Sequence, residues 1–289
     1  MNIIGRKYIF LTVSGLLLLA AVSALIFFGL KQGIDFVGGT LWQVRLGGAA
    51  IMKDLTKELP PETTITFNET NRSYLIRLPE LSETDHQKYL KILTEKFTPV
   101  EELSFEVIGP AIGQELRQKS IWAFFAVLLL ISFYIAIAFR SVSYPVRSWK
   151  YGLITLVTLF HDALIPAGFA AILGRLYGVE IGANFIVAIL VVMGFSVHDT
   201  IVVFDRIREN LKFKRDVVQN FAEIVNVSIN QTLARSINTS LTLVLVLLAL
   251  YLFGPAALGY FILTILLGVI VGTYSSIFVA SPLLVLWQK

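Results

Sequence analysis

The sequence from Gly194 to Asn210 reads Gly-Phe-Ser-Val-His-Asp-Thr-Ile-Val-Val-Phe-Asp-Arg-Ile-Arg-Glu-Asn. It ends an apolar segment in which Phe185–Phe195 carries no charge, and four apolar residues lie between Asp199 and Asp205. This pattern is typical of a membrane-spanning helix with one carboxylate inside the bilayer. An ionised group there costs at least about 2.5 kcal/mol. Asp199 therefore either faces a protein interior with a partner or takes part in ion movement.

The whole chain has the composition of a polytopic membrane protein. Of its 289 residues, 56% are hydrophobic and 15% are charged, and the mean hydropathy is +0.74. Soluble domains contain about 25% charged residues. A helix needs about 20 apolar residues to cross the hydrocarbon core. We expect six such spans, at Tyr8–Leu30, Ser120–Phe139, Tyr151–Leu173, Asn184–Phe204, Ser236–Phe253 and Leu258–Leu286.

Basic residues predict the orientation of these spans. Three of the segments outside the spans carry nearly all of the relevant basic residues: Arg6 and Lys7; Arg140, Arg147 and Lys150; and Arg206, Arg208, Lys212, Lys214 and Arg215. The third-to-fourth connection has only Arg175, and the fifth-to-sixth has none. Because basic loops stay in the cytoplasm, we expect both termini there.

The first span resembles a signal peptide, because Arg6-Lys7 precedes an apolar run that contains Ala21-Val-Ser-Ala24. Its apolar core continues through Phe28 and exceeds the usual length of about 7–15 residues. We therefore expect residues 1–30 to be an uncleaved membrane anchor with a cytoplasmic N-terminus.

A polar region at 31–119 is predicted to lie outside the cytoplasm. Strand patterns occur at Thr40–Leu46, Thr63–Asn68, Ser73–Leu78 and Glu102–Ile108, with helical patterns at Ile51–Leu59 and Ser82–Phe97, a turn at Asn68–Asn71, and Ser82 as a helix cap. The order βαββαβ predicts a small ferredoxin-like α+β domain. That fold supports many functions and indicates no particular chemistry.

The remaining region, 120–289, is predicted to hold five membrane helices. Within it, residues 205–232 are too polar to cross the bilayer, yet their apolar residues keep a helical spacing. They read as an amphipathic helix at the cytoplasmic interface, or as an ordinary solvated loop helix. Gly268-Val-Ile-Val-Gly272 is a GxxxG sequence, which indicates close helix packing but is common in membrane helices.

Several kinds of chemistry find no support in the sequence. The chain has no cysteine, which excludes disulfides, thiolate metal sites and cysteine nucleophiles. No His-Glu-x-x-His spacing exists, so we expect neither a metal nor another cofactor. The net charge of +4 follows membrane topology and does not indicate nucleic-acid binding.

Asp199 has two candidate polar neighbours. Ser196 precedes it by three residues and shares its helix face. Arg235 lies just before the fifth apolar run, whose polar positions Asn238, Thr239 and Thr242 follow at helical spacing. Protonation of Asp199 could then make or break a pair with Arg235. The structural alternatives are that Arg235 is a snorkelling interfacial anchor and that Asp199 is a satisfied packing residue.

Asp162 is the deepest carboxylate by position, about ten residues from each end of the third span. It could serve in a proton relay or in packing. His161 beside it is expected to point elsewhere on the helix. His198 precedes Asp199, and its role stays open.

Four sequences in order resemble the SecF family of protein-export membrane subunits. Gly33-Ile-Asp35-Phe36-Val-Gly38-Gly39-Thr40 looks like the signature that opens the family's external domain. Val107–Leu116 resembles the return to the second span, Gly194–Asn210 the family's most recognisable motif, and Gln231–Ser240 the entry to its fifth span. The resemblance covers essentially the whole chain.

This resemblance implies a function that the residues alone do not supply. The family, which is related to RND transporters, assists the late stage of secretion through the SecYEG channel and uses the proton-motive force. It implies SecD as obligate partner, a translocating unfolded polypeptide as cargo, lipid contact, and location in the bacterial inner membrane. The family's proton-pathway carboxylate and arginine carry over to Asp199 and Arg235, with Asp162, Ser196 and His198 as further candidates. It implies no enzyme; the alternative is an RND-type exporter of lipids or small molecules.

Overall fold

The computed structural model describes the chain except for residues 48–51, 69–71, 141–144, 214–220, 256–257 and 289. The chain divides into two compact units. The membrane unit consists of residues 1–31 and 122–289, and the sheet unit of residues 32–121.

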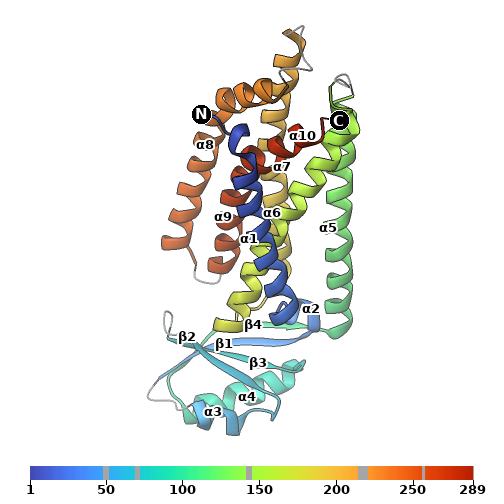
Figure 1. The fold of residues 1–289 in the computed structure, drawn as a ribbon. Coiled ribbons are helices and arrows are strands. Elements are labelled where there is room, and N and C mark those ends of the chain that lie inside the picture. Colours follow the sequence, from blue (N-terminus) through green and yellow to red (C-terminus); the bar gives the residue numbers. More distant parts are fainter. Residues whose placement is uncertain (48–51, 69–71, 141–144, 214–220, 256–257, 289) are drawn as a thin grey trace. The chain divides into compact units, whose positions relative to one another are not determined.

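Six helices among the described residues are long and apolar enough to cross a membrane. They are α1 (Lys7–Phe28) with the short turn η1 (Ile4–Arg6), α5 (Pro110–Ala138), α6 (Ser148–Tyr177), α7 (Ala183–Phe213), α8 (Phe221–Phe253), and a last helix made of α9 (Gly259–Ser275), the π-helical turn η3 (Ser276–Ala280) and α10 (Ser281–Leu286). The predicted six-span fold is confirmed. Figure 1 shows both chain ends at the same end of the membrane unit, as an even number of spans requires.

Small residues allow the helices of the membrane unit to approach closely. α1 packs mainly on α6, and α9 packs on α7 and α8. A Cβ atom at Gly268 would lie 2.2 Å from Cγ2 of Val192, and one at Gly272 would lie 3.0 Å from Cβ of Ser196. The close packing predicted from the GxxxG sequence is thus present, between α9 and α7.

The described parts of segment 205–232 belong to α7 and α8. Residues up to Phe213 continue α7, and residues from Phe221 begin α8. Their apolar side chains pack into the main core, since Ile207, Phe221, Ile224, Val225 and Ile229 are all buried there. The helical spacing was therefore real, but it marks a face that covers the bundle core.

The first turns of α8 run across the bundle before the helix turns along it (Figure 1). Polar side chains in this stretch bind the backbone of the preceding turn. Ser228 donates to the carbonyl of Ile224, and Thr232 donates to that of Ser228. Such bonds compete with the helix ladder and bend helices.

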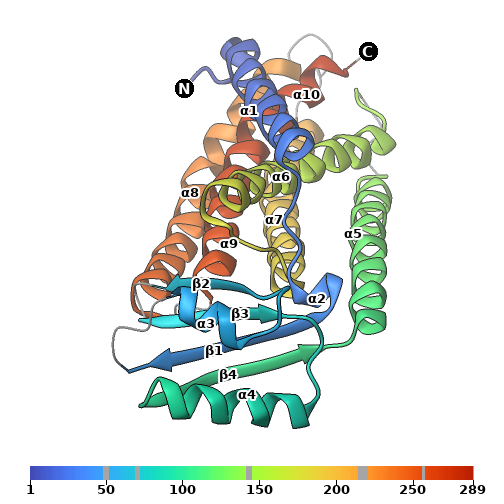
Figure 2. The same cartoon turned by 90° about the horizontal axis from the view of Figure 1, so that it is seen from below.

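The sheet unit has the predicted ferredoxin-like arrangement. A short helix α2 (Ile34–Val37) precedes β1 (Gly39–Leu46), α3 (Met52–Glu58), β2 (Thr64–Asn68), β3 (Ser73–Leu78), α4 (Glu83–Lys96) and β4 (Val100–Ile108). The antiparallel strands lie in the order β2-β3-β1-β4, as Figure 2 shows. Ser82 caps α4 by accepting from the Asp85 amide. The turn predicted at Asn68–Asn71 falls largely outside the described residues.

One face of the sheet packs against α3 and α4. Its core includes Trp42, Ile76 and Leu78 from the strands and Leu55 and Leu93 from the helices. The indole of the fully buried Trp42 donates to Glu102, which also bonds Nε2 of His86. The buried Trp42 and His86 side chains are therefore both paired with Glu102, as burial favours.

The contact between α1 and α6 yields a stability prediction. A Cβ atom at Gly168 would lie 2.5 Å from the Ala21 Cα atom, which is backbone. Gly168→Ala should therefore force the two helices apart and cost about 1–3 kcal/mol, the usual penalty for overpacking. Thermal unfolding of the purified protein should show a lowered Tm.

Gly15→Ala is the matched control, because a Cβ atom there meets nothing within 4 Å. Alanine favours a helix over glycine by about 0.5–1 kcal/mol, so the Tm of this variant should not fall. Equal Tm values for the two variants would contradict the close contact.

Candidate functional site

Asp199 lies on α7 inside the membrane unit and is 5% exposed. Its two carboxylate oxygens accept hydrogen bonds from different helices. Ser236 of α8 donates to Oδ1 at 2.6 Å, and Ser276 of η3 donates to Oδ2 at 2.5 Å. The carboxylate is thus buried with hydroxyl partners, and no cation pairs with it among the described residues.

Asp162 lies on α6 and is fully buried. Its Oδ2 accepts from Ser196 of α7 and, at 2.6 Å, from Ser275 of α9. Its Oδ1 lies 2.8 Å from Nδ1 of His161. The other ring nitrogen of His161 lies 2.5 Å from Oγ of Ser14 on α1. Four helices therefore contribute to one polar cluster.

Two expectations about these neighbours were wrong. His161 does not point elsewhere, because its ring folds back onto the adjacent carboxylate. Ser196 shares the face of Asp199, yet it donates across the helix interface to Asp162. His161 bonds its own chain neighbour and Ser196 bonds a residue of another helix, and helical spacing alone predicts neither bond.

The expected pair between Asp199 and Arg235 is not formed. Arg235 is exposed, whereas the next residue, Ser236, is buried against Asp199. Successive residues on a helix point about 100° apart, at about 3.6 residues per turn, so only one of the two can face the carboxylate. His198 is likewise exposed, while Asp199 after it is buried.

A group of exposed polar side chains lies on α8. Arg235, Asn238, Thr239 and Thr242 of α8 are all exposed, within a helix apolar enough to span the bilayer. Lipid tails offer no hydrogen bonds to such groups. We name these four residues the polar face of α8.

The sequence reasoning missed Ser14, Ser236, Ser275 and Ser276. All four are buried. Single serines in an apolar run are common in membrane helices, where they bond the preceding turn. The adjacent pair Ser275-Ser276, within an otherwise apolar helix, was the available signal. Among the described residues no three His, Asp or Glu side chains gather as a metal site.

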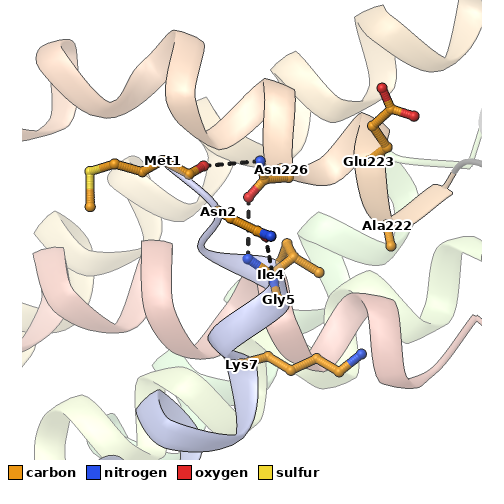
Figure 3. Close-up of a pocket in the computed structure, with 8 residues that line it drawn as sticks. All are labelled: Met1, Asn2, Ile4, Gly5, Lys7, Ala222, Glu223 and Asn226. Atoms are coloured by element: carbon orange, nitrogen blue, oxygen red, sulfur yellow. Dashed lines mark hydrogen bonds between the residues drawn. The ribbon is translucent and has the colours of Figure 1, made fainter.

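A cavity at the start of the chain is lined by neither of these carboxylates. It has a volume of about 560 Å³ and is lined by Met1, Asn2, Ile4, Gly5, Lys7, Ala222, Glu223 and Asn226 (Figure 3). Oδ1 of Asn226 accepts from the amides of Ile3 and Ile4, and its amide nitrogen donates to the Met1 carbonyl. These bonds attach the N-terminal segment to α8.

A second cavity, of about 540 Å³, opens between α1, α5, α6 and the last helix. Its walls are almost entirely leucine, valine and phenylalanine side chains. Ser14 and His161 also line it, so the polar cluster around Asp162 reaches its edge.

The expected signature of the sheet unit has a clear steric basis. Gly38 and Gly39 have φ of 78° and 120°, which β-carbon-bearing residues rarely adopt. A Cβ atom at Gly38 would lie 2.7 Å from Cα of Pro110, and one at Gly39 would lie 2.8 Å from the Leu78 carbonyl. Phe36 is buried beside them, and Asp35 lies in the first turn of α2. Gly33 precedes that helix.

Known proteins resemble this chain throughout its length. The family of SecD/SecF protein-export membrane proteins, C-terminal part, matches residues 88–289, and the SecD/SecF GG motif matches residues 23–50. Protein translocase subunit SecF of Thermobaculum terrenum is 43% identical over 100% of this chain and 94% of its own. The SecF of Anaerolinea thermophila is 35% identical over the same shares.

A solved structure agrees with these sequence relatives. The crystal structure of SecDF from Thermus thermophilus, described as a translocon-associated membrane protein, superposes with a TM-score of 0.84 at 36% identity. All of this chain is matched, and it spans 38% of that longer chain. The fold, the glycine signature and the sequence relatives thus agree, and the chain belongs to the SecD/SecF family of protein-export membrane proteins.

Proposed function

We propose that this chain is a SecF-like subunit that works with SecD in the late stage of protein translocation through the SecYEG channel. It couples proton flow through its membrane unit to movement of its sheet unit. The pair of carboxylates buried among serine hydroxyls carries the proposal. On this basis the chain is an auxiliary of secretion and not an enzyme.

Proton binding is the chemistry that suits Asp162 and Asp199. Each carboxylate is buried, and serine hydroxyls from neighbouring helices donate to its oxygens. A hydroxyl can donate to an ionised carboxylate or accept from a protonated one, so these partners suit both forms. A carboxyl group held by hydroxyl groups can bind and release a proton, and a proton is the ion that we propose for this pair.

The available energy is sufficient for such coupling. One proton crossing 100 mV supplies about 2.3 kcal/mol, and one unit of pH difference adds about 1.4 kcal/mol. A difference of that size shifts a two-state population by tenfold or more.

SecD is the partner that would cover the polar face of α8. The longer SecDF chain from Thermus thermophilus contains a SecF-like part equal to 38% of its length, which leaves room for a SecD part in the same protein. Arg235 and His198 are exposed on α8 and α7, and in lipid they would stay unsatisfied. We propose that they face SecD and extend the proton pathway from Ser196 and the two aspartates.

The proposed location is the bacterial inner membrane, with both termini in the cytoplasm and the sheet unit outside. The distribution of basic residues supports this orientation. The external sheet unit then contacts the emerging unfolded polypeptide, and lipid surrounds the outer helix faces. The exporter alternative is not favoured, because the relatives named above are translocase subunits.

Asp199→Asn tests the function. The change keeps the size of the side chain but removes its proton exchange. In vesicles that contain the chain, SecD and SecYEG, proton-driven translocation of a secretory precursor should fall at least about tenfold. The variant can no longer use the free energy of proton entry, and a loss of about 1.4 kcal/mol already corresponds to a tenfold change.

Asp205→Asn is its control. Asp205 is exposed on the same helix and pairs with Arg208 at 2.5 Å, so its loss should leave translocation near the native rate. Full proton-driven activity of Asp199→Asn would refute the proposed coupling.

The orientation can be checked independently because the chain has no native cysteine. Lys88 of α4 and Lys212 of α7 are both exposed. In intact cells Lys88→Cys should react with a membrane-impermeant maleimide, whereas Lys212→Cys should react only after the membrane is opened. The reverse pattern would overturn the assignment of the cytoplasmic side.

A further inference from the structure

Two adjacent serines of the last helix contact two different carboxylates. Ser275, the final residue of α9, donates to Asp162 on α6 at 2.6 Å. Ser276, the first residue of η3, donates to Asp199 on α7 at 2.5 Å. Neighbouring residues on a helix point in different directions, and here those directions lead to the two aspartates. All four residues are at most 5% exposed.

Each serine also has a second acceptor within its own helix. Oγ of Ser275 lies 3.0 Å from the Gly272 carbonyl, and Oγ of Ser276 lies 3.0 Å from the Thr273 carbonyl. A hydroxyl has one proton to donate. When the carboxylate is ionised, it is the stronger acceptor and takes that proton's hydrogen bond. When the carboxylate is protonated, its own O–H can donate to the serine, whose hydroxyl can turn to the backbone carbonyl.

The backbone at this point departs from the regular α-helix. Ser276–Ala280 forms a π-helical turn, and Ser281 donates to the Ser276 carbonyl at 3.2 Å. π-helical turns occur frequently at functional sites. Ser276 is the first residue of this turn, so a change in its hydrogen bonding acts where the regular α-helix ends.

A second connection between the same two carboxylates runs through Ser196 and the backbone of α7. Ser196 donates to Asp162 and lies three residues before Asp199 on α7, against the glycine Gly272 of α9. The titratable groups that face the cluster are few. His161 faces Asp162 from α6, and Asp199 has only Ser236 and Ser276 as described side-chain partners. His198 and Arg235 are exposed beside them.

We propose that Ser275 and Ser276 are positioning residues that link Asp162 and Asp199 into one proton-binding unit. The inference rests on the proposed function, which it deepens. A proton that binds Asp199 stays on that carboxyl group. The Ser276 hydroxyl turns without losing its own proton, the last helix adjusts, and the hydrogen bond from Ser275 to Asp162 changes in strength. Coupled sites of this kind titrate as a pair and not singly.

The test is pH-difference infrared spectroscopy of the full chain in complex with SecD. Protonated aspartates give separate carbonyl bands, which Asp162→Asn and Asp199→Asn identify by their loss. Ser276→Ala should move the Asp199 band to higher frequency, because that carboxyl loses a hydrogen bond. It should also move the Asp162 band, which Ser276 does not contact. Ser275→Ala should likewise move both bands.

Ser240→Ala is the matched control. Ser240 is a buried serine of α8 that bonds the Ser236 carbonyl and Thr273 but neither carboxylate. Its removal should leave both bands in place. Asp199→Asn provides a variant without any serine change, and it should displace the Asp162 band.

The proposal is overturned if each serine variant moves only the band of its own carboxyl, or if Asp199→Asn leaves the Asp162 band unmoved. This outcome is separate from failure of the proposed function, because the spectra require no translocation. Coupled bands in a protein whose Asp199→Asn variant still translocates would refute the function and leave the serine link standing.

Discussion

The membrane unit is organised around two carboxylates that must be satisfied where water is scarce. Asp162 and Asp199 together bond four serine hydroxyls and one imidazole, which come from α6, α7, α8 and the last helix, while Ser14 of α1 supports the imidazole. An unsatisfied charge there would cost several kcal/mol. Five helical segments are therefore fixed relative to one another by the same few hydrogen bonds, and a proton at either carboxylate changes them.

Glycine makes this arrangement sterically possible. Gly268 and Gly272 bring α9 against Val192 and Ser196 of α7, and this contact delivers Ser275 to Asp162. The membrane core thus combines tight apolar contacts with a polar centre. Movement of the last helix would disturb both at once, which is what coupling of proton binding to a conformational change requires.

Much of the architecture could be predicted from the sequence, whereas the contacts of the site residues could be predicted only in part. Six apolar runs and the alternation of strands and helices at 31–119 predicted the spans and the sheet, because length and periodicity act locally. The burial of Asp199 was also predictable. The direction of Arg235 was not, because one residue of helical rotation exchanges a buried position for an exposed one, and the bonds of the buried His161 and Ser196 depend on which groups packing brings near them. Only tertiary packing shows that Ser236 faces Asp199 and Arg235 does not.

The central claim is that the buried carboxylates bind transported protons and do more than hold helices together. Proton entry into liposomes that contain the chain with SecD, driven by a membrane potential and followed with an internal pH dye, tests it most directly. Asp162→Asn keeps the shape of the fully buried side chain. The account predicts that this variant assembles with SecD yet admits protons no faster than protein-free liposomes. Proton entry at the native rate in that variant would contradict it.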